Sequence, residues 1–156
     1  MVPSLSTVLQ SLALILVSLV VGSMFGIWRG YVLADYSPSA FLEVHQGAVR
    51  GLNTLLPGLA LAALVATAAL AYLARDRQPT FGLYLAVIAL VIVGGLITRF
   101  LNQPINAQVM TWHAGGLPTN WQDLRDSWWT WHIARLATTF CGEVLLIAAI
   151  FSDRRV

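Results

Sequence analysis

The sequence predicts an all-α integral membrane protein, an antiparallel four-helix bundle of up-down-up-down topology. Hydrophobic residues make up 58% of the chain and charged residues only 10%, whereas charged residues are about 25% of a typical soluble domain. Four apolar stretches are long enough for the ~20 residues that a spanning helix needs. The chain has 156 residues and no internal repeat, so we expect a single four-helix domain over residues 1–156.

The charged residues indicate no nucleic-acid partner. The net charge of +2 comes from nine arginines, no lysine and seven acidic residues, and the arginines are dispersed along the chain. A nucleic-acid-binding protein carries a clustered basic patch instead. The lone cysteine, Cys141, lies in an apolar run, so it can form no intrachain disulfide and is interpreted as a small packed hydrophobic residue.

The first spanning helix is predicted over residues 5–28, an apolar run that ends before Arg29. Small residues recur every four positions along one face of this helix. Such a ridge lets another helix backbone approach closely, which is how helices associate in lipid. The partner is either another helix of the bundle or a second copy of the chain in a homo-oligomer. The ridge consists of Ser18, Gly22, Gly26 and Gly30.

The second helix is predicted to begin at Ser37, a favourable N-cap, with Pro38 at the first helical position. The helical pattern then continues unbroken to Ala74, which corresponds to about 54 Å of helix. That length exceeds the ~30 Å hydrocarbon core of a bilayer. We therefore place the spanning part at residues 53–74 and expect the earlier turns to lie at or beyond the interface.

Polar residues of this second helix are predicted to contribute to a ligand site. Gln46, Arg50 and Asn53 follow at helical steps and share one face. His45 lies about 100° away from that face. We therefore expect all four side chains near the site, with the placement of His45 less direct than that of the other three.

The third spanning helix is predicted over residues 80–101, followed by the motif NQPIN. Pro104 is predicted to break the helix, because proline lacks the backbone N–H. Asn102 and Asn106 flank this proline, where they either cap freed backbone groups or donate hydrogen bonds to a ligand carbonyl. Residues 107–121 are rich in turn formers and tryptophan, and we expect a polar extramembrane cap between the third and fourth helices.

The fourth helix is predicted to begin outside the membrane, at a capping box of Thr119 and Gln122, and to span it over residues 131–151. Polar residues recur at steps of three or four along one face of its N-terminal half. Because charged groups are unfavourable in hydrocarbon, this face is expected to meet protein and to be paired there. The face consists of Trp128, His132, Arg135, Thr139 and Glu143.

Four spans with short connections alternate in direction, so their polar residues are predicted to converge in one chamber near one leaflet. The opposite end is predicted to be a plain charged rim. Its arginines favour the cytoplasm by the positive-inside rule, and we expect a bacterial inner-membrane protein with both termini in the cytoplasm. The rim residues are Arg75, Asp76, Arg77, Asp153, Arg154 and Arg155.

Three motifs carry a family resemblance: HQGAVRGLN at residues 45–53 with Pro57 after it, NQPIN at 102–106 with Trp112 after it, and LPTNWQDLRDSWWTWHIAR at 117–135. With the glycine-rich first helix, they resemble the anthrone oxygenase-like family of small four-helix membrane proteins over essentially the whole chain. The resemblance implies a compact membrane bundle. Most relatives in this group have no assigned reaction, and some oxidise anthrones to anthraquinones with molecular oxygen and no evident cofactor.

We predict a pocket that binds a small, flat, hydrophobic phenol, anthrone or quinone. His132 is predicted to act as a general base or hydrogen-bond partner, and Arg135 to stabilise a phenolate or a reduced oxygen species. The alternative is that both belong to a polar network that only fixes helix register. The predicted ligand-binding residues are Asn102, Asn106, Gln46, Arg50, Asn53, His45 and Trp128, with Trp128 stacking on the ligand.

No cofactor is expected, although two alternatives remain open. A non-haem metal would need ligands from separate helices, because the sequence contains no H-x-x-x-H, E-x-x-H or C-x-x-C spacing. Haem would be held by His45 and His132. The alternative function is a non-catalytic membrane protein, either a binder of a lipophilic ligand or an accessory subunit of a larger membrane complex. The candidate metal ligands are Glu43, His45, His113, His132 and Glu143.

Overall fold

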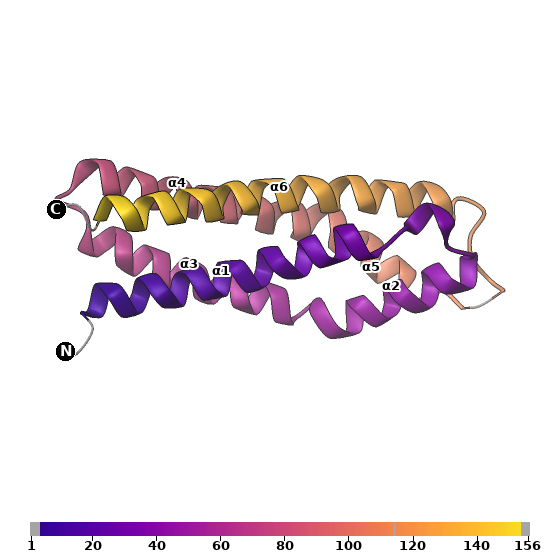
Figure 1. The fold of residues 1–156 in the computed structure, drawn as a ribbon. Helices are drawn as coiled ribbons and strands as arrows, with labels where there is room; N and C mark the ends of the chain where they lie inside the picture. Colours follow the sequence, from indigo (N-terminus) through magenta and orange to yellow (C-terminus); the bar gives the residue numbers. More distant parts are fainter. Residues whose placement is uncertain (1–3, 114, 154–156) are drawn as a thin grey trace.

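The computed structural model describes residues 4–113 and 115–153, and in this part of the chain all regular structure is helical (Figure 1). Four helical segments are each long and apolar enough to cross a membrane, which confirms the predicted four-helix membrane bundle. A short turn, η1 (Leu33–Asp35), follows the first segment. The segments are α1 (Leu5–Gly30), α2 (Pro38–Leu52) with α3 (Leu55–Leu73), α4 (Gln78–Ile97) with η2 (Thr98–Asn102) and α5 (Gln103–Val109), and α6 (Trp121–Asp153).

The chain passes back and forth along one axis, so that the first turn of α1 and the last turn of α6 lie at the same end (Figure 1). In the membrane half of the bundle, α1 packs against α3 and α6, and α4 packs against the same two helices. Buried apolar side chains fill the space between these helices, among them Val17, Leu70, Tyr84 and Leu146. Large apolar residues such as Phe100 point outward and are exposed, as expected for a surface that faces lipid.

The second segment is broken, whereas the sequence predicted an unbroken helix to Ala74. It begins as predicted, with Ser37 accepting a hydrogen bond from the backbone of Ala40. It is then interrupted at residues 53–54, between α2 and α3. The cause is Pro57, because a proline has no N–H to donate and its ring clashes with the carbonyl four residues earlier, that of Asn53.

The third segment is continuous through Pro104, so the predicted helix break at this residue is wrong. The five residues before α5 form the π-helical turn η2. There the N–H of Gln103 bonds to the carbonyl of Thr98, five residues earlier. This wider ring displaces the carbonyl of Phe100, with which the proline would otherwise clash. The helix therefore absorbs Pro104 and continues to Val109.

The three glycines of the small-residue ridge of α1 face outward and are exposed, whereas its fourth member, Ser18, donates a hydrogen bond to Glu143 of α6. A Cβ atom added to Gly22 or Gly26 would meet no other atom within 4 Å. The close helix approach occurs instead at Gly94 of α4, where an added Cβ would lie 2.6 Å from Oγ1 of Thr139 in α6. The prediction of a homo-oligomer or a larger complex stays a prediction.

The end of the bundle opposite the cap contains a buried polar cluster, whereas the sequence predicted only a plain charged rim. The carboxylate of Asp153 is 6% exposed. It forms an ion pair with Arg77 at 2.8 Å and accepts a hydrogen bond from the amide of Gln10 at 2.7 Å. It therefore ties α6 to α1 and to the residue that precedes α4. Arg154 and Arg155 lie outside the described residues.

Candidate functional site

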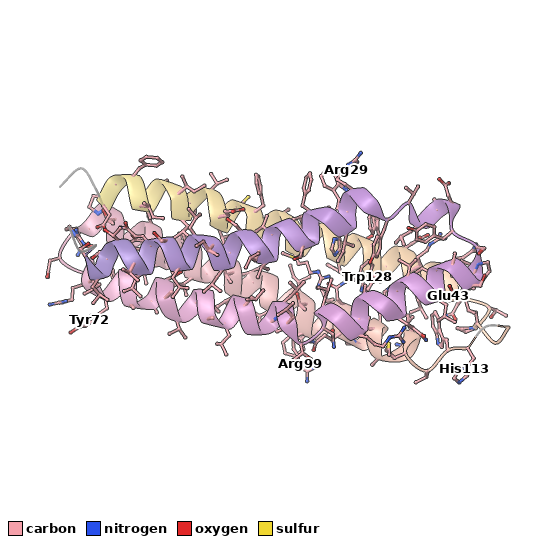
Figure 2. The ribbon with its side chains drawn as sticks, turned by 60° about the horizontal axis from the view of Figure 1, so that its bottom comes forward. Arg29, Glu43, Tyr72, Arg99, His113 and Trp128 are labelled. Atoms are coloured by element: carbon pink, nitrogen blue, oxygen red, sulfur yellow. The ribbon has the colours of Figure 1, made fainter. Side chains whose placement is uncertain are left out.

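A cavity of about 180 Å³ lies in the bundle beside the break between α2 and α3 and beside the π-helical turn η2. Both irregularities interrupt regular helix packing, and π-helical turns are frequent at functional sites. Most of the lining is apolar, with residues from α1, α2, α3 and α4. Figure 2 shows Trp128 among the helices near the cap half of the bundle. The polar and aromatic lining residues are His45, Asn53, Thr98, Arg99, Gln103, Asn106, Trp128, Arg135 and Thr139.

Arg135 is a buried cation with no acidic partner among the described residues. Its side chain lines the cavity and the residue is 8% exposed. One terminal nitrogen, Nη2, donates to Nδ1 of His132 at 3.0 Å, and Nη1 donates to Oγ1 of Thr98 at 3.4 Å. Its Nε atom has no hydrogen-bond partner in the described part of the chain. The guanidinium is therefore held in place by neutral groups alone.

His132 is fully buried and forms a hydrogen bond with Arg135. Because Nδ1 accepts from the guanidinium, the other ring nitrogen, Nε2, carries the hydrogen and donates to the carbonyl of Met24 at 3.0 Å. The imidazole stacks on Trp128 with ring centroids 5.1 Å apart. Both nitrogens are thus engaged and the side chain does not line the cavity. His132 positions Arg135 and does not itself face a ligand.

Asn106 joins three neighbours and sets the protonation of His45. Its Oδ1 accepts from Nε1 of Trp128 at 2.8 Å, and its Nδ2 donates to Asn53 at 3.1 Å. An indole N–H can only donate, so the acceptor oxygen of Asn106 is identified without ambiguity. Nε2 of His45 lies 3.1 Å from that oxygen and must therefore carry the hydrogen. This leaves Nδ1 of His45 as a lone-pair acceptor with no hydrogen-bond partner among the described residues, and His45 lines the cavity.

Two other predicted ligand-binding residues serve the fold in this structure. Asn102 is fully buried and donates to the carbonyl of Trp128 at 3.0 Å, but it does not line the cavity. Gln46 donates to the carbonyls of Val109 and Trp112, at 2.9 and 3.1 Å. The amide of Gln46 therefore connects α2 to the end of α5.

Arg50 is exposed and does not line the cavity. The structure thus brings together His45, Asn53, Asn106 and Trp128 of the predicted ligand-binding set, with the predicted Arg135 beside them. It does not bring Arg50 to this site.

Four polar lining residues were not among the catalytic or ligand-binding residues predicted from the sequence, namely Thr98, Arg99, Gln103 and Thr139. A signal was present, because Thr98 and Asn106 belong to a row of polar residues spaced by four along the third helix. The carbonyl of Met24, which accepts a hydrogen bond from His132, could not be predicted, because it is a backbone group and the sequence pattern concerns side chains.

The five candidate metal ligands do not come together. Glu43 and His113 lie at the outer end of the bundle, beyond Trp128 (Figure 2), and both are exposed. Glu143 lies elsewhere and accepts a hydrogen bond from Ser18 of α1 at 2.5 Å. Within residues 4–113 and 115–153, no three His, Cys, Asp or Glu side chains are grouped so that they could hold a metal ion.

The comparisons with known proteins gave one match. A family model described as "Anthrone oxygenase" matches residues 47–145. The matched segment includes the break at Asn53, the turn η2, and the residues Trp128 and Arg135. No curated protein and no solved structure was found to match the chain.

Proposed function

Since the chain belongs to the anthrone oxygenase family, we propose that its cavity binds a flat aromatic ligand, stabilises it in anionic form as a phenolate or enolate, and oxidises it with molecular oxygen. The observation that carries this proposal is the buried guanidinium of Arg135, which faces the cavity without an acidic partner among the described residues. The same proposal accounts for the aromatic and apolar lining of the site.

The charge of Arg135 calls for an anionic ligand. An ion moved out of water loses several kcal/mol of solvation even after the protein relaxes, by order of magnitude. No Asp or Glu lines the cavity among the described residues, so the protein itself supplies no negative charge there. A ligand oxygen that carries negative charge would restore the missing interaction through charge-assisted hydrogen bonds.

The size and the walls of the cavity favour an aromatic ring. A dry apolar cavity of about 150 Å³ is known to accommodate benzene, and this cavity measures about 180 Å³. Trp128 offers an indole ring in the wall, on which a flat ligand can stack. A ligand with more than one ring must extend through the open side of the cavity.

His45 and Arg135 are proposed to carry the chemistry. Nδ1 of His45 takes a proton from the CH₂ group of an anthrone, and Arg135 stabilises the enolate oxygen that results. This proposal moves the role of base from His132 to His45, because both nitrogens of His132 are hydrogen-bonded. His132 then positions the guanidinium.

The proposed oxidation needs no reactant other than anthrone and molecular oxygen. The electron-rich enolate reduces molecular oxygen, and a C–O bond forms at the deprotonated carbon to give a hydroperoxide. The second hydrogen of that carbon then leaves as a proton while the O–O bond breaks. One oxygen atom becomes the new carbonyl and the other becomes water, so that anthrone and O₂ yield anthraquinone and H₂O.

Oxygen uptake with anthrone as substrate tests the proposal, measured on purified protein in lipid nanodiscs against protein-free nanodiscs. Arg135→Gln is expected to lower uptake about tenfold to a hundredfold, since charge-assisted hydrogen bonds contribute about 1.5–3 kcal/mol. His45→Gln is expected to lower it about a hundredfold. Arg50→Gln is the matched control, because this arginine is exposed and lies outside the cavity.

The same assay separates this proposal from a non-catalytic ligand binder. Wild-type protein that binds anthraquinone but consumes oxygen no faster than protein-free nanodiscs would establish the binder instead. Equal uptake in wild type and Arg135→Gln would contradict the assigned role of the guanidinium.

We further propose that the protein lies in a bacterial inner membrane with both termini in the cytoplasm. The arginines of residues 75–77 support this orientation by the positive-inside rule. In a Cys141→Ala background, a cysteine placed at His113 should react with a membrane-impermeant maleimide in cells with a permeabilised outer membrane. A cysteine at Asp76 should react only after lysis, and the reverse pattern would contradict the orientation.

A further inference from the structure

The cavity reaches the outer surface of the bundle between α3 and the end of α4. Three of its lining residues are themselves exposed, namely Pro57 of α3, Gly95 of α4 and Arg99 of η2. An added Cβ atom at Gly95 would meet nothing within 4 Å, so the surface beside this glycine is open. The cavity therefore has a side opening that is framed by two helices.

This opening faces the hydrocarbon region. Gly95 belongs to the uninterrupted apolar part of α4, and the most apolar 18 residues of this membrane-spanning segment have a mean hydropathy of 2.5. Large apolar residues close in sequence to Pro57, Gly95 and Arg99 are exposed on the outer surface, namely Leu55, Leu96 and Phe100, at 53%, 50% and 66%. A surface of this composition is solvated by lipid chains. A molecule that enters here comes from the bilayer.

Arg99 stands at the rim of the opening with its charge uncompensated. It lines the cavity and is exposed, and Figure 2 shows it projecting from the side of the bundle. It forms no ion pair with any residue in the described part of the chain. Because it directly follows the apolar run of α4, we place it where the hydrocarbon meets the headgroups. The cavity thus has one cation inside, Arg135, and a second at its mouth.

We propose that the ligand is an amphiphilic aromatic acid that enters sideways from the bilayer, and that Arg99 selects it by binding its acidic group at the rim. This inference rests on the proposed function and names the class of ligand for the same site. The aromatic part lies in the cavity against Trp128, with its oxygen toward Arg135. A carboxylate or second phenolate at the other end of the molecule then lies at Arg99, near the headgroups.

Paired probes test the role of Arg99. Anthraquinone-2-carboxylate carries the acidic group and 2-methylanthraquinone lacks it, and binding of each to protein in nanodiscs is followed by quenching of tryptophan fluorescence. Arg99→Gln is expected to raise the dissociation constant of the carboxylate about threefold to fivefold, as for a solvent-accessible ion pair. The dissociation constant of the neutral probe should stay unchanged. Arg50→Gln, which alters an exposed arginine outside the cavity, should change neither value.

A second pair of variants tests the route of entry. Gly95→Trp places a large side chain over the opening, and Gly82→Trp places the same side chain on the same helix at an exposed site outside the cavity. In stopped-flow measurements, Gly95→Trp is expected to slow association of both probes about fivefold or more, since access limits the rate. Gly82→Trp should leave the rate unchanged. Gly95→Leu replaces Gly95→Trp if the larger ring lowers the yield of folded protein.

The outcomes separate this inference from the proposed function. If wild-type protein binds neither probe, both the proposed function and this inference are contradicted. If wild type binds both probes and Arg135→Gln weakens both, the proposed contact between Arg135 and the ligand oxygen stands. In that case, an Arg99→Gln variant that affects both probes equally or neither of them, or a Gly95→Trp variant that binds as fast as Gly82→Trp, overturns the present inference alone.

Discussion

Two adjacent glycines of α4 should respond in opposite ways to the same substitution. Gly94 faces α6, where an added Cβ would lie 2.6 Å from Oγ1 of Thr139 and 3.3 Å from Oγ1 of Thr138. Gly95 faces the open side, where an added Cβ would meet nothing within 4 Å. Alanine at position 94 must therefore push two helices apart, whereas alanine at position 95 occupies free space.

The size of the destabilisation by Gly94→Ala depends on how little the side chain of Thr139 can move. Its hydroxyl oxygen is bonded directly to Cβ, so it cannot swing away as the end of a long side chain does. It also donates to the carbonyl of Arg135 at 2.8 Å, and rotation would break that bond. Overpacking of this kind costs about 1–3 kcal/mol. Gly95→Ala instead gains helix propensity of up to about 1 kcal/mol, so we expect the two variants to differ by about 2 kcal/mol or more.

Unfolding of both variants by SDS in mixed micelles, followed by far-UV circular dichroism, measures this difference. The double variant Gly94→Ala/Thr139→Ala removes the clashing oxygen and should recover about 1–2 kcal/mol relative to the sum of the single variants. Since Gly94 and Thr139 also line the cavity, ligand affinity should fall in Gly94→Ala and return in the double variant. Equal unfolding free energies for Gly94→Ala and Gly95→Ala would refute the close approach of α4 and α6 at this point.

Three further predictions concern the buried polar groups. His132→Phe keeps a ring stacked on Trp128 but removes the acceptor of Arg135, so oxygen uptake should fall about tenfold, as for one lost hydrogen bond to a charged group; His132→Gln, which can restore an acceptor, should recover part of it. Trp128→Phe removes the indole N–H that Asn106 accepts at 2.8 Å and also shortens a ring that is only 4% exposed, so unfolding titrations should show a loss of about 1–3 kcal/mol. Asp153→Asn should destabilise the protein by about 1–2 kcal/mol, since its carboxylate is 6% exposed and paired. The control Asp76→Asn, at an aspartate that is 86% exposed, should change the same unfolding free energy by less than about 0.5 kcal/mol.

The overall architecture was predictable because it depends on properties that the sequence displays directly. Apolar runs of sufficient length predicted helices that can cross a membrane, and all of them are present. The spacing of Trp128, His132 and Arg135 predicted one polar face, and all three residues are buried. A charged face in lipid can only turn inward, so its burial follows from its composition. The family resemblance was confirmed by the match over residues 47–145.

The effects of two prolines were not predictable from local sequence. Pro57 accompanies a break in the second segment, whereas the helix continues through Pro104 by means of a π-helical turn. Both outcomes relieve the same missing N–H and the same clash with an earlier carbonyl. Which one occurs depends on the neighbouring helices, since an unpaired backbone group in a membrane must find a partner nearby.

The roles of the two histidines also depend on distant residues. His132 donates to the carbonyl of Met24, which is 108 positions away in the chain. His45 lies beside Asn106, 61 positions away, and its hydrogen is placed by the bond between Asn106 and Trp128. The spacing of residues along one helix contains no information on such partners. The sequence therefore indicated five residues that line the cavity, but it also indicated others that do not, and it did not show which imidazole faces the cavity.

The cavity and its charge follow from the same structural cause. The break before α3 and the turn η2 lie in neighbouring segments, and both line the cavity, so the regular packing that elsewhere closes the bundle is interrupted at this level. Arg135 reaches this space from α6, where its guanidinium is held by a histidine and a threonine but by no described carboxylate. An aliphatic residue there would fill space without needing a partner. The guanidinium has no acidic partner among the described residues, so the proposed anionic ligand would supply the missing negative charge. Neutral and anionic forms of one aromatic ligand should therefore differ in affinity.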